Sequence, residues 1–68
     1  MTVLIKEEKA GNMALFLELR QGYDYVYYSV AVCNNYGTDM YRTEKEYTTH
    51  EKQKALRTFN RYRKNYLQ

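Results

Sequence analysis

"MALFLELRQGYDYVYYSVAVC", residues 13–33, contains two segments in which apolar side chains alternate with others, separated by the turn-forming residues Gln-Gly-Tyr-Asp. Alternation with a period of two is typical of β-strands that bury one face. Gly22 suits the positive φ that short hairpin turns often require. The stretch therefore predicts an antiparallel hairpin with strands at residues 13–20 and 25–33.

The faces of this hairpin follow from folding it about residues 21–24. Apolar residues then meet apolar residues: Leu19 lies opposite Val26, Leu17 opposite Tyr28, Leu15 opposite Val30 and Met13 opposite Val32. A shift by one residue would exchange the two faces. In this register Arg20 lies opposite Tyr25, and Phe16, Tyr25 and Tyr27 are left on the outer face.

One further strand is predicted on each side of the hairpin. Residues 2–7 form the first, with Val3 and Ile5 on one face. Residues 40–47 form the last, with Tyr41 and Tyr47 toward the core. Its outward residues are charged: Arg42, Glu44 and Glu46. Such a strand suits a sheet edge, because its charges discourage pairing with another molecule.

The end of the chain predicts a helix over residues 49–66, because apolar residues recur there with helical period. Thr48 and Glu51 match a capping box at its start. The apolar stripe consists of Ala55, Leu56, Phe59, Tyr62 and Tyr66, and the opposite side of His50, Lys54, Arg57, Arg61 and Lys64. The expected fold is α+β, a four-stranded antiparallel β-meander with one C-terminal helix packed on one face, in a single small domain.

Composition narrows the class of protein. A chain of 68 residues makes one domain with a thin stability margin. Its one cysteine, Cys33, excludes an internal disulfide and fits a reducing compartment. With the one histidine, His50, it leaves too few soft ligands for a zinc site. Neither a membrane span nor a signal peptide is present in the sequence, so we expect a cytoplasmic protein with no metal or cofactor.

An enzyme is not expected, and no catalytic residue is assigned. Nucleophilic catalysis needs an activated thiol or hydroxyl, and nothing in the sequence brings Cys33 to His50. The acid pairs at residues 7–8 and 44–46 fall in charged segments that we expect to be solvated. The three glycines are isolated in predicted turns, so there is no phosphate-binding loop.

Positive charge is concentrated in the predicted helix. Residues 1–49 carry five cations and seven acids, whereas residues 50–68 carry six cations and one acid. Lys54, Arg57, Arg61 and Lys64 form a row about 15 Å long at 1.5 Å per residue, which is suited to a phosphate backbone. The alternative is a solvated helix face whose cations complement the helix dipole.

The outer face of the sheet is the second candidate site, through Phe16, Tyr25 and Tyr27. Single-strand RNA modules stack bases on such aromatic rings. In the predicted register, however, Glu18 lies opposite Tyr27, and the neighbouring strand adds further acids. Exposed aromatic residues among mixed charges favour a protein contact over a nucleic acid.

The segment "EYTTHEKQKAL", residues 46–56, resembles the integrase-type DNA-binding domains, which also set a small antiparallel sheet against a C-terminal helix. The resemblance covers about the last third of the chain. It implies that DNA would be read by the sheet. Glu18, Glu44 and Glu46 depart from that pattern, so the likeness is architectural and does not define the function.

Two functional hypotheses follow. The first is a small non-enzymatic protein-binding module, accessory or inhibitory, acting through Phe16, Tyr25 and Tyr27 on the sheet or through the basic helix face. The alternative is a domain that binds DNA or RNA through the basic helix face. No membrane is expected as a partner. A monomer and a homodimer both stay open, because the apolar segment at residues 2–5 is suited to pairing with a copy of itself.

Overall fold

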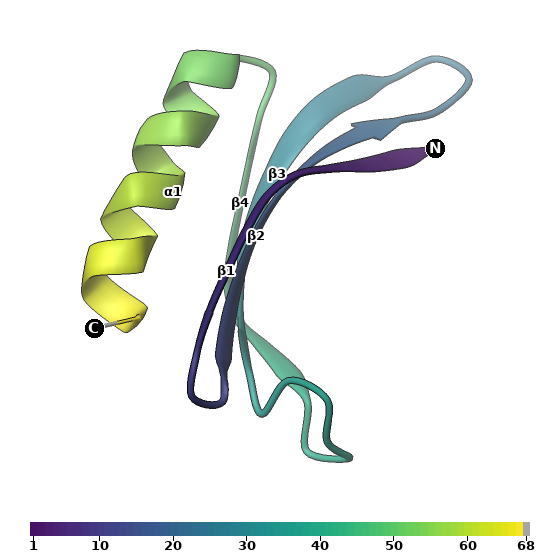
Figure 1. Cartoon of the computed structure of the whole chain (residues 1–68). Helices are drawn as coiled ribbons and strands as arrows, with labels where there is room; N and C mark the ends of the chain where they lie inside the picture. Colours follow the sequence, from purple (N-terminus) through teal and green to yellow (C-terminus); the bar gives the residue numbers. More distant parts are fainter. Residues whose placement is uncertain (68) are drawn as a thin grey trace.

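The computed structural model describes residues 1–67. It contains the strands β1 (Thr2–Ala10), β2 (Met13–Gln21), β3 (Val26–Asn34) and β4 (Arg42–Thr49), followed by the helix α1 (Lys52–Tyr66). The strands form one open antiparallel sheet in the order β1-β2-β3-β4. The helix lies along one face of this sheet (Figure 1). The predicted α+β fold with four strands and a C-terminal helix is confirmed.

The hairpin of β2 and β3 forms as predicted, but its register differs. Leu19 pairs with Tyr28, Leu17 with Val30 and Leu15 with Val32, and Arg20 lies opposite Tyr27 rather than Tyr25. The predicted register is therefore wrong by two residues. The turn spans residues 22–25, and the amide of Gly22 donates to the carbonyl oxygen of Tyr25 at 2.9 Å. A shift by two keeps every side chain on its face, so the apolar pattern could not reveal it.

The pairing of β3 with β4 contains a β-bulge that changes which side chains face the helix. Val32 lies opposite Lys45, whereas the next residue, Cys33, lies opposite Thr43. The extra residue, between Thr43 and Lys45, reverses which side chains face the helix from there to the start of β4. Tyr47 packs against the core as predicted. The prediction for Tyr41 is wrong, because its hydroxyl reaches the Cys33 sulfur at 3.2 Å on the outer face.

The first strand is longer than predicted and is also irregular. It extends to Ala10 and joins β2 through a two-residue turn, in which Gly11 has a φ of 60°. The ladder shifts between Leu4 and Lys6. Lys6 rather than Ile5 therefore takes the position opposite Leu17. The regular alternation predicted for this strand is interrupted at the bulge.

The helix ends at Tyr66 as predicted but begins at Lys52, three residues later than expected. Thr48 and Thr49 belong to β4 and are held in the β3–β4 ladder. The capping box is therefore wrong: Glu51 is the N-cap residue and makes no side-chain capping bond. Its amide donates instead to the hydroxyl of Thr49 at 3.1 Å.

The core lies between α1 and the helix-facing side of the sheet. Its buried members are Leu15, Leu17, Val30, Val32, Ala55, Phe59 and Tyr62. Leu56 and Tyr66 pack at its margin, so the predicted apolar stripe of the helix is confirmed. Thr58 is also buried, which the sequence reasoning missed. The ammonium of Lys6 covers the exposed edge of this core at 5.0 Å from the centre of the Phe59 ring.

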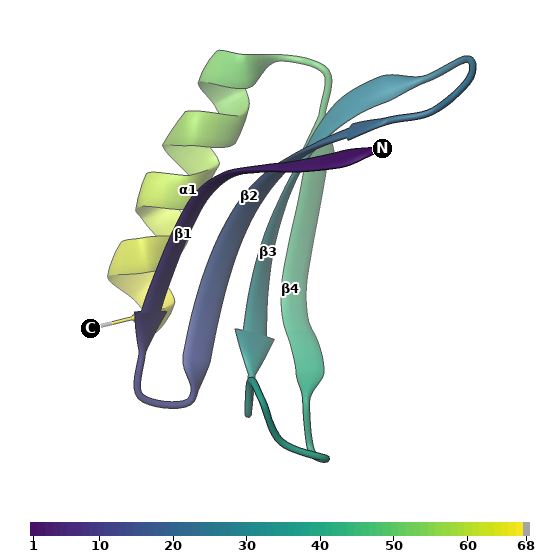
Figure 2. The same cartoon turned by 45° about the vertical axis from the view of Figure 1, so that its right-hand side comes forward.

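The sheet is longer than the helix that covers it. The helix packs on β2, β3 and β4. The start of β1 and the β2–β3 hairpin bend away beyond the first turn of the helix, where the N-terminus lies beside the hairpin (Figure 2). Backbone hydrogen bonds in both directions between Met1 and Gln21 join these two segments. One end of the sheet is therefore free of the helix on both faces.

Leu17→Ala tests the assignment of the core. Leu17 is fully buried among core residues, so we expect the variant to lose about 2–5 kcal/mol of unfolding free energy through lost transfer energy and a cavity. Urea unfolding measures this loss. Leu4→Ala is the control, since Leu4 is 50% exposed, and it should lose well under half as much. Equal losses would show that β2 does not face the helix as described.

Candidate binding surfaces

Exposed apolar side chains gather at the end of the sheet that the helix leaves uncovered. Residues 1–67 contain ten exposed large hydrophobic residues, and seven belong to this end. These seven residues, which we call the tip surface, are Met1, Val3, Leu4, Ile5, Tyr23, Tyr25 and Val26. They come from the start of β1, the β2–β3 turn and the start of β3. Strand pairing brings them together, with Val3 opposite Leu19 and Gln21 opposite Val26.

The turn is built so that a tyrosine ring lies over its own backbone. Gly22 does not have a positive φ, contrary to expectation. A Cβ atom at Gly22 would lie 2.1 Å from the Tyr25 ring, so only glycine admits the ring there. Tyr25 in turn contacts Tyr27, with ring centroids 5.7 Å apart. Two of the three residues predicted for the sheet site are therefore neighbours, Tyr25 in the turn and Tyr27 on the outer face.

The third predicted residue, Phe16, lies apart from that pair. It is half-buried opposite Ala31 and contacts Tyr36, with ring centroids 5.4 Å apart. Tyr36 also contacts Tyr41, at 5.8 Å. These rings line a shallow depression of the outer face beside the β3–β4 loop. Phe16 is thus covered in part by a loop residue, and it belongs to a second aromatic cluster at the opposite end of the sheet from the tip surface.

Polar pairs separate the two aromatic clusters across the outer face. The Arg20 guanidinium pairs with the Glu18 carboxylate at 3.1 Å. The hydroxyl of Ser29 donates to the Glu46 carboxylate at 3.0 Å. Glu18 lies opposite Ser29, not opposite Tyr27 as predicted. The charges of Glu18 and Arg20 compensate each other, whereas Glu46 is hydrogen-bonded but keeps its negative charge, so the middle of the outer face offers little attraction to an anionic ligand.

The helix face opposite the core carries the predicted basic row. Lys54, Arg57, Arg61 and Lys64 are all exposed. Lys54 is paired with Glu51 at 3.0 Å, and this carboxylate raises the pKa of Lys54. No ion pair within residues 1–67 reaches the other three. We refer to Arg57, Arg61 and Lys64 as the basic row below.

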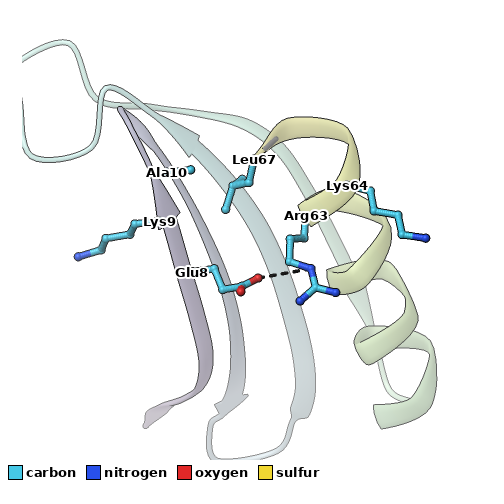
Figure 3. Close-up of a pocket in the computed structure, with 6 residues that line it drawn as sticks. All are labelled: Glu8, Lys9, Ala10, Arg63, Lys64 and Leu67. Carbon is cyan, nitrogen blue, oxygen red and sulfur yellow. Dashed lines mark ion pairs between the residues drawn. The ribbon is translucent and has the colours of Figure 1, made fainter.

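A neighbouring arginine is used differently. Arg63 reaches from the last turn of α1 toward β1, where its guanidinium lies 3.6 Å from the Glu8 carboxylate (Figure 3). The adjacent Lys64 points away from the sheet in the same view. The two cations therefore have separate roles, since Arg63 ties the helix to the edge strand and Lys64 faces solvent. The sequence alone could not reveal this pair, because it joins residues near the two ends of the chain.

Several charges of the helix oppose its own stability. Residues 52–66 contain six cations and no acid. Lys52 and Lys54 lie in the first turn, where no acidic residue is present and the helix dipole favours negative charge. Arg57 and Arg61 are four residues apart, a spacing at which like charges destabilise a helix. Only the cations of the last turn complement the dipole.

The groups with catalytic potential lie far apart. Cys33 is buried near the end of β3 beside Tyr41. His50 precedes the helix, and its Nδ1 lies 3.0 Å from the carbonyl oxygen of Val26 at the start of β3. Seven residues of strand, about 23 Å at 3.3 Å each, separate Val26 from Cys33. Residues 1–67 contain no group of three or more His, Cys, Asp or Glu residues placed to hold a metal ion.

Comparisons of the chain with protein-family models, with curated proteins and with solved structures each gave no match. Within residues 1–67, no helix combines the length and the apolar character needed to cross a membrane. The function is therefore argued from the surfaces alone.

The tip surface is the feature that sequence reasoning missed. Val26 alternates with its neighbours like a core residue and is assigned to the inward face, and residues 2–5 are considered only as a segment that could pair with a second copy of the chain. The available signal was length: a helix of 15 residues spans about 22 Å, whereas strands of nine residues span about 30 Å. The helix cannot cover the whole apolar face of such strands, and the remainder has to be exposed.

Cys33→Ala tests the contact between Cys33 and Tyr41. The hydrogen bond to the thiol, together with partial burial, raises the pKa of Tyr41 above its ordinary value of 10.0. The variant should lower that pKa, which is measured by following the Tyr41 ring carbons with pH by NMR. Because the folded-state pKa is raised, the stabilising effect of the contact is present below pH 10 and is lost as the pH rises through the pKa of Tyr41. An unchanged titration of Tyr41 would contradict the contact.

Lys52→Glu tests whether the first-turn cation opposes folding. The change places an acid near the positive end of the helix dipole, so unfolding free energy should rise by about 0.3–1 kcal/mol in low salt. Urea unfolding measures it. The matched control is Lys64→Glu, the same charge reversal in the last turn, which should be destabilising. A loss of stability in the Lys52 variant would show that this cation has a structural role.

Proposed function

We propose that this protein is a small non-enzymatic protein-binding module whose binding surface is the tip surface. The observation that carries the proposal is the gathering of seven exposed large apolar residues at the one end of the sheet that α1 does not cover. Contiguous exposed apolar patches on small soluble domains mark interaction sites more often than isolated apolar residues do. Tyrosines at such a patch supply contact area at low entropic cost.

The composition of the tip surface favours a protein over a nucleic acid. None of its seven side chains is charged. The nearest cation along β2, Arg20, is paired with Glu18 and lies opposite Tyr27. A phosphate chain at this end would therefore meet apolar side chains, Asp24 and one cation, the Met1 ammonium, which already donates to the carbonyl oxygen of Gln21, so it would gain little electrostatic attraction.

The geometry of β1 supports a mode of binding. β1 is an edge strand, and its segment Thr2–Ile5 carries no charged residue. The other edge, β4, is protected by charges at Arg42, Glu44, Lys45 and Glu46. Charges of this kind discourage strand addition, and their absence permits it. We propose that an extended apolar segment of the partner adds to the sheet along Thr2–Ile5 and contacts Tyr25.

The proposed setting is the cytoplasm, where Cys33 stays a free buried thiol. A module of this kind acts by binding to a partner protein, and its proposed role is therefore accessory or inhibitory. The tip surface contains Tyr25, one of the three residues predicted from the sequence, and it borders Tyr27. Phe16 contributes to the separate cluster beside the β3–β4 loop and is not part of the proposed interface.

Leu4→Lys tests this proposal. Peptides that bind the full chain are first selected from a random library, and their affinity is then measured by fluorescence anisotropy. We expect apolar, extended peptides whose affinity falls at least tenfold in the variant, because the new ammonium would be desolvated in the complex. The matched control is Met40→Lys, the same kind of change at an exposed apolar residue of the β3–β4 loop, which should leave binding unchanged.

Two outcomes would overturn the proposal. If selected peptides bind equally well to the Leu4→Lys variant, their site lies elsewhere on the protein. If light scattering shows that the wild-type chain is a dimer and that the Leu4→Lys variant is a monomer, a second copy of the chain occupies the tip surface instead of another protein. Backbone amide shifts in NMR spectra of the complex show directly which residues are contacted.

A further inference from the structure

We propose that the exposed face of α1 binds the phosphate backbone of a nucleic acid, without reading its sequence. This binding would use the basic row and is independent of the tip surface, which lies on strands beyond the first turn of the helix.

The free cations are those of the basic row. Acids within the described chain already pair with Lys54 and Arg63, at 3.0 and 3.6 Å. Arg57, Arg61 and Lys64 are exposed, and no ion pair in residues 1–67 reaches them. From Arg57 to Lys64 the row spans about 10 Å of the helix axis at 1.5 Å per residue. This length matches about three phosphates at the 3.4 Å rise of one strand.

Helix stability accounts for Lys64, which lies in the last turn and complements the dipole, but not for the rest of this arrangement. The helix has six cations and no acid, its first turn contains Lys52 and Lys54, and Arg57 and Arg61 repel each other at a spacing of four residues. The rest of the chain is net acidic, with eight acids and five cations, yet none of these acids lies in the helix. An anionic ligand outside the chain removes this repulsion by neutralising the row.

The surroundings of the row favour nucleic acid over other anions. Every exposed residue of α1 is either cationic or an amide: Lys52, Gln53, Lys54, Arg57, Asn60, Arg61, Arg63, Lys64 and Asn65. The apolar side of the helix is buried against the sheet, so it cannot insert into a bilayer as interfacial helices do. The face also lacks the aromatic or aliphatic anchors on which protein interfaces depend. Lys and Arg side chains, together with Asn and Gln amides, are among the groups that contact phosphate oxygens.

The experiment is an anisotropy titration of the full chain with labelled duplex DNA, single-stranded DNA and single-stranded RNA across a salt series. We expect weak binding to duplex DNA. The logarithm of the association constant should fall with the logarithm of salt concentration with a slope near −3, because about three phosphates are contacted. Arg57→Gln with Arg61→Gln should bring that slope close to −1 and lower the low-salt affinity at least tenfold.

The matched control is Lys9→Gln with Arg42→Gln, which removes the same charge from the two edge strands. Both side chains lie outside the helix, near Glu7 and Glu44 respectively. This variant should retain most of the affinity and the wild-type salt slope. An equal loss in both variants would mean that net charge alone drives binding, and it would overturn the assignment to the row.

Further outcomes also decide the proposal. Binding to none of the three nucleic acids at about 50 mM salt, the low end of the range over which such contacts weaken, overturns it. Stronger association with vesicles of phosphatidylcholine and phosphatidylserine than with any nucleic acid overturns it in favour of a membrane surface. Leu4→Lys at the tip surface should leave the nucleic-acid titration unchanged or slightly stronger, so the row and the tip surface can fail separately.

Discussion

A difference in length between the sheet and the helix that covers it shapes the rest of this structure. Burial of apolar area is the main stabilising term for so short a chain, and the core is assembled where α1 reaches the sheet, around Phe59, Leu15 and Leu17. The helix spans about 22 Å, less than the strands on which it lies. The alternating apolar pattern of β2 and β3 continues past the helix, and there the same residue types become exposed surface.

The elements could be predicted from the sequence because their patterns are local. The period of two in β2 and β3 and the stripe of Ala55, Phe59 and Tyr62 follow from side-chain geometry within one element. Irregularities could not be predicted, because they depend on pairing. The bulge opposite Cys33 moved Tyr41 to the outer face, and the two-residue difference in the hairpin left every face unchanged. The capping box failed because the β3–β4 ladder extends to Thr49.

The same distinction applies to the candidate sites. The basic row could be read from the sequence residue by residue, because helical spacing alone places Arg57, Arg61 and Lys64 together. The structure added which of the neighbouring cations are paired, through Glu51 and Glu8. The tip surface is assembled from three segments by strand pairing, and its core-like pattern concealed it. Sequence reasoning therefore found the surface made by one element and missed the one made by several.

Both surfaces reduce the stability of a domain that has little to spare. An uncovered apolar end forgoes burial that a longer helix would have provided, and an all-cationic helix face repels itself. A domain of this size could relieve the second effect with a single acid in place of Lys52 or Asn60. Stabilising changes of this kind are easily available to natural sequences. The presence of two such features, on separate parts of the molecule and of opposite chemistry, is explained if each is covered or neutralised by a ligand. We therefore propose that the folded chain is a scaffold for two contacts, one apolar at the sheet end and one electrostatic along the helix.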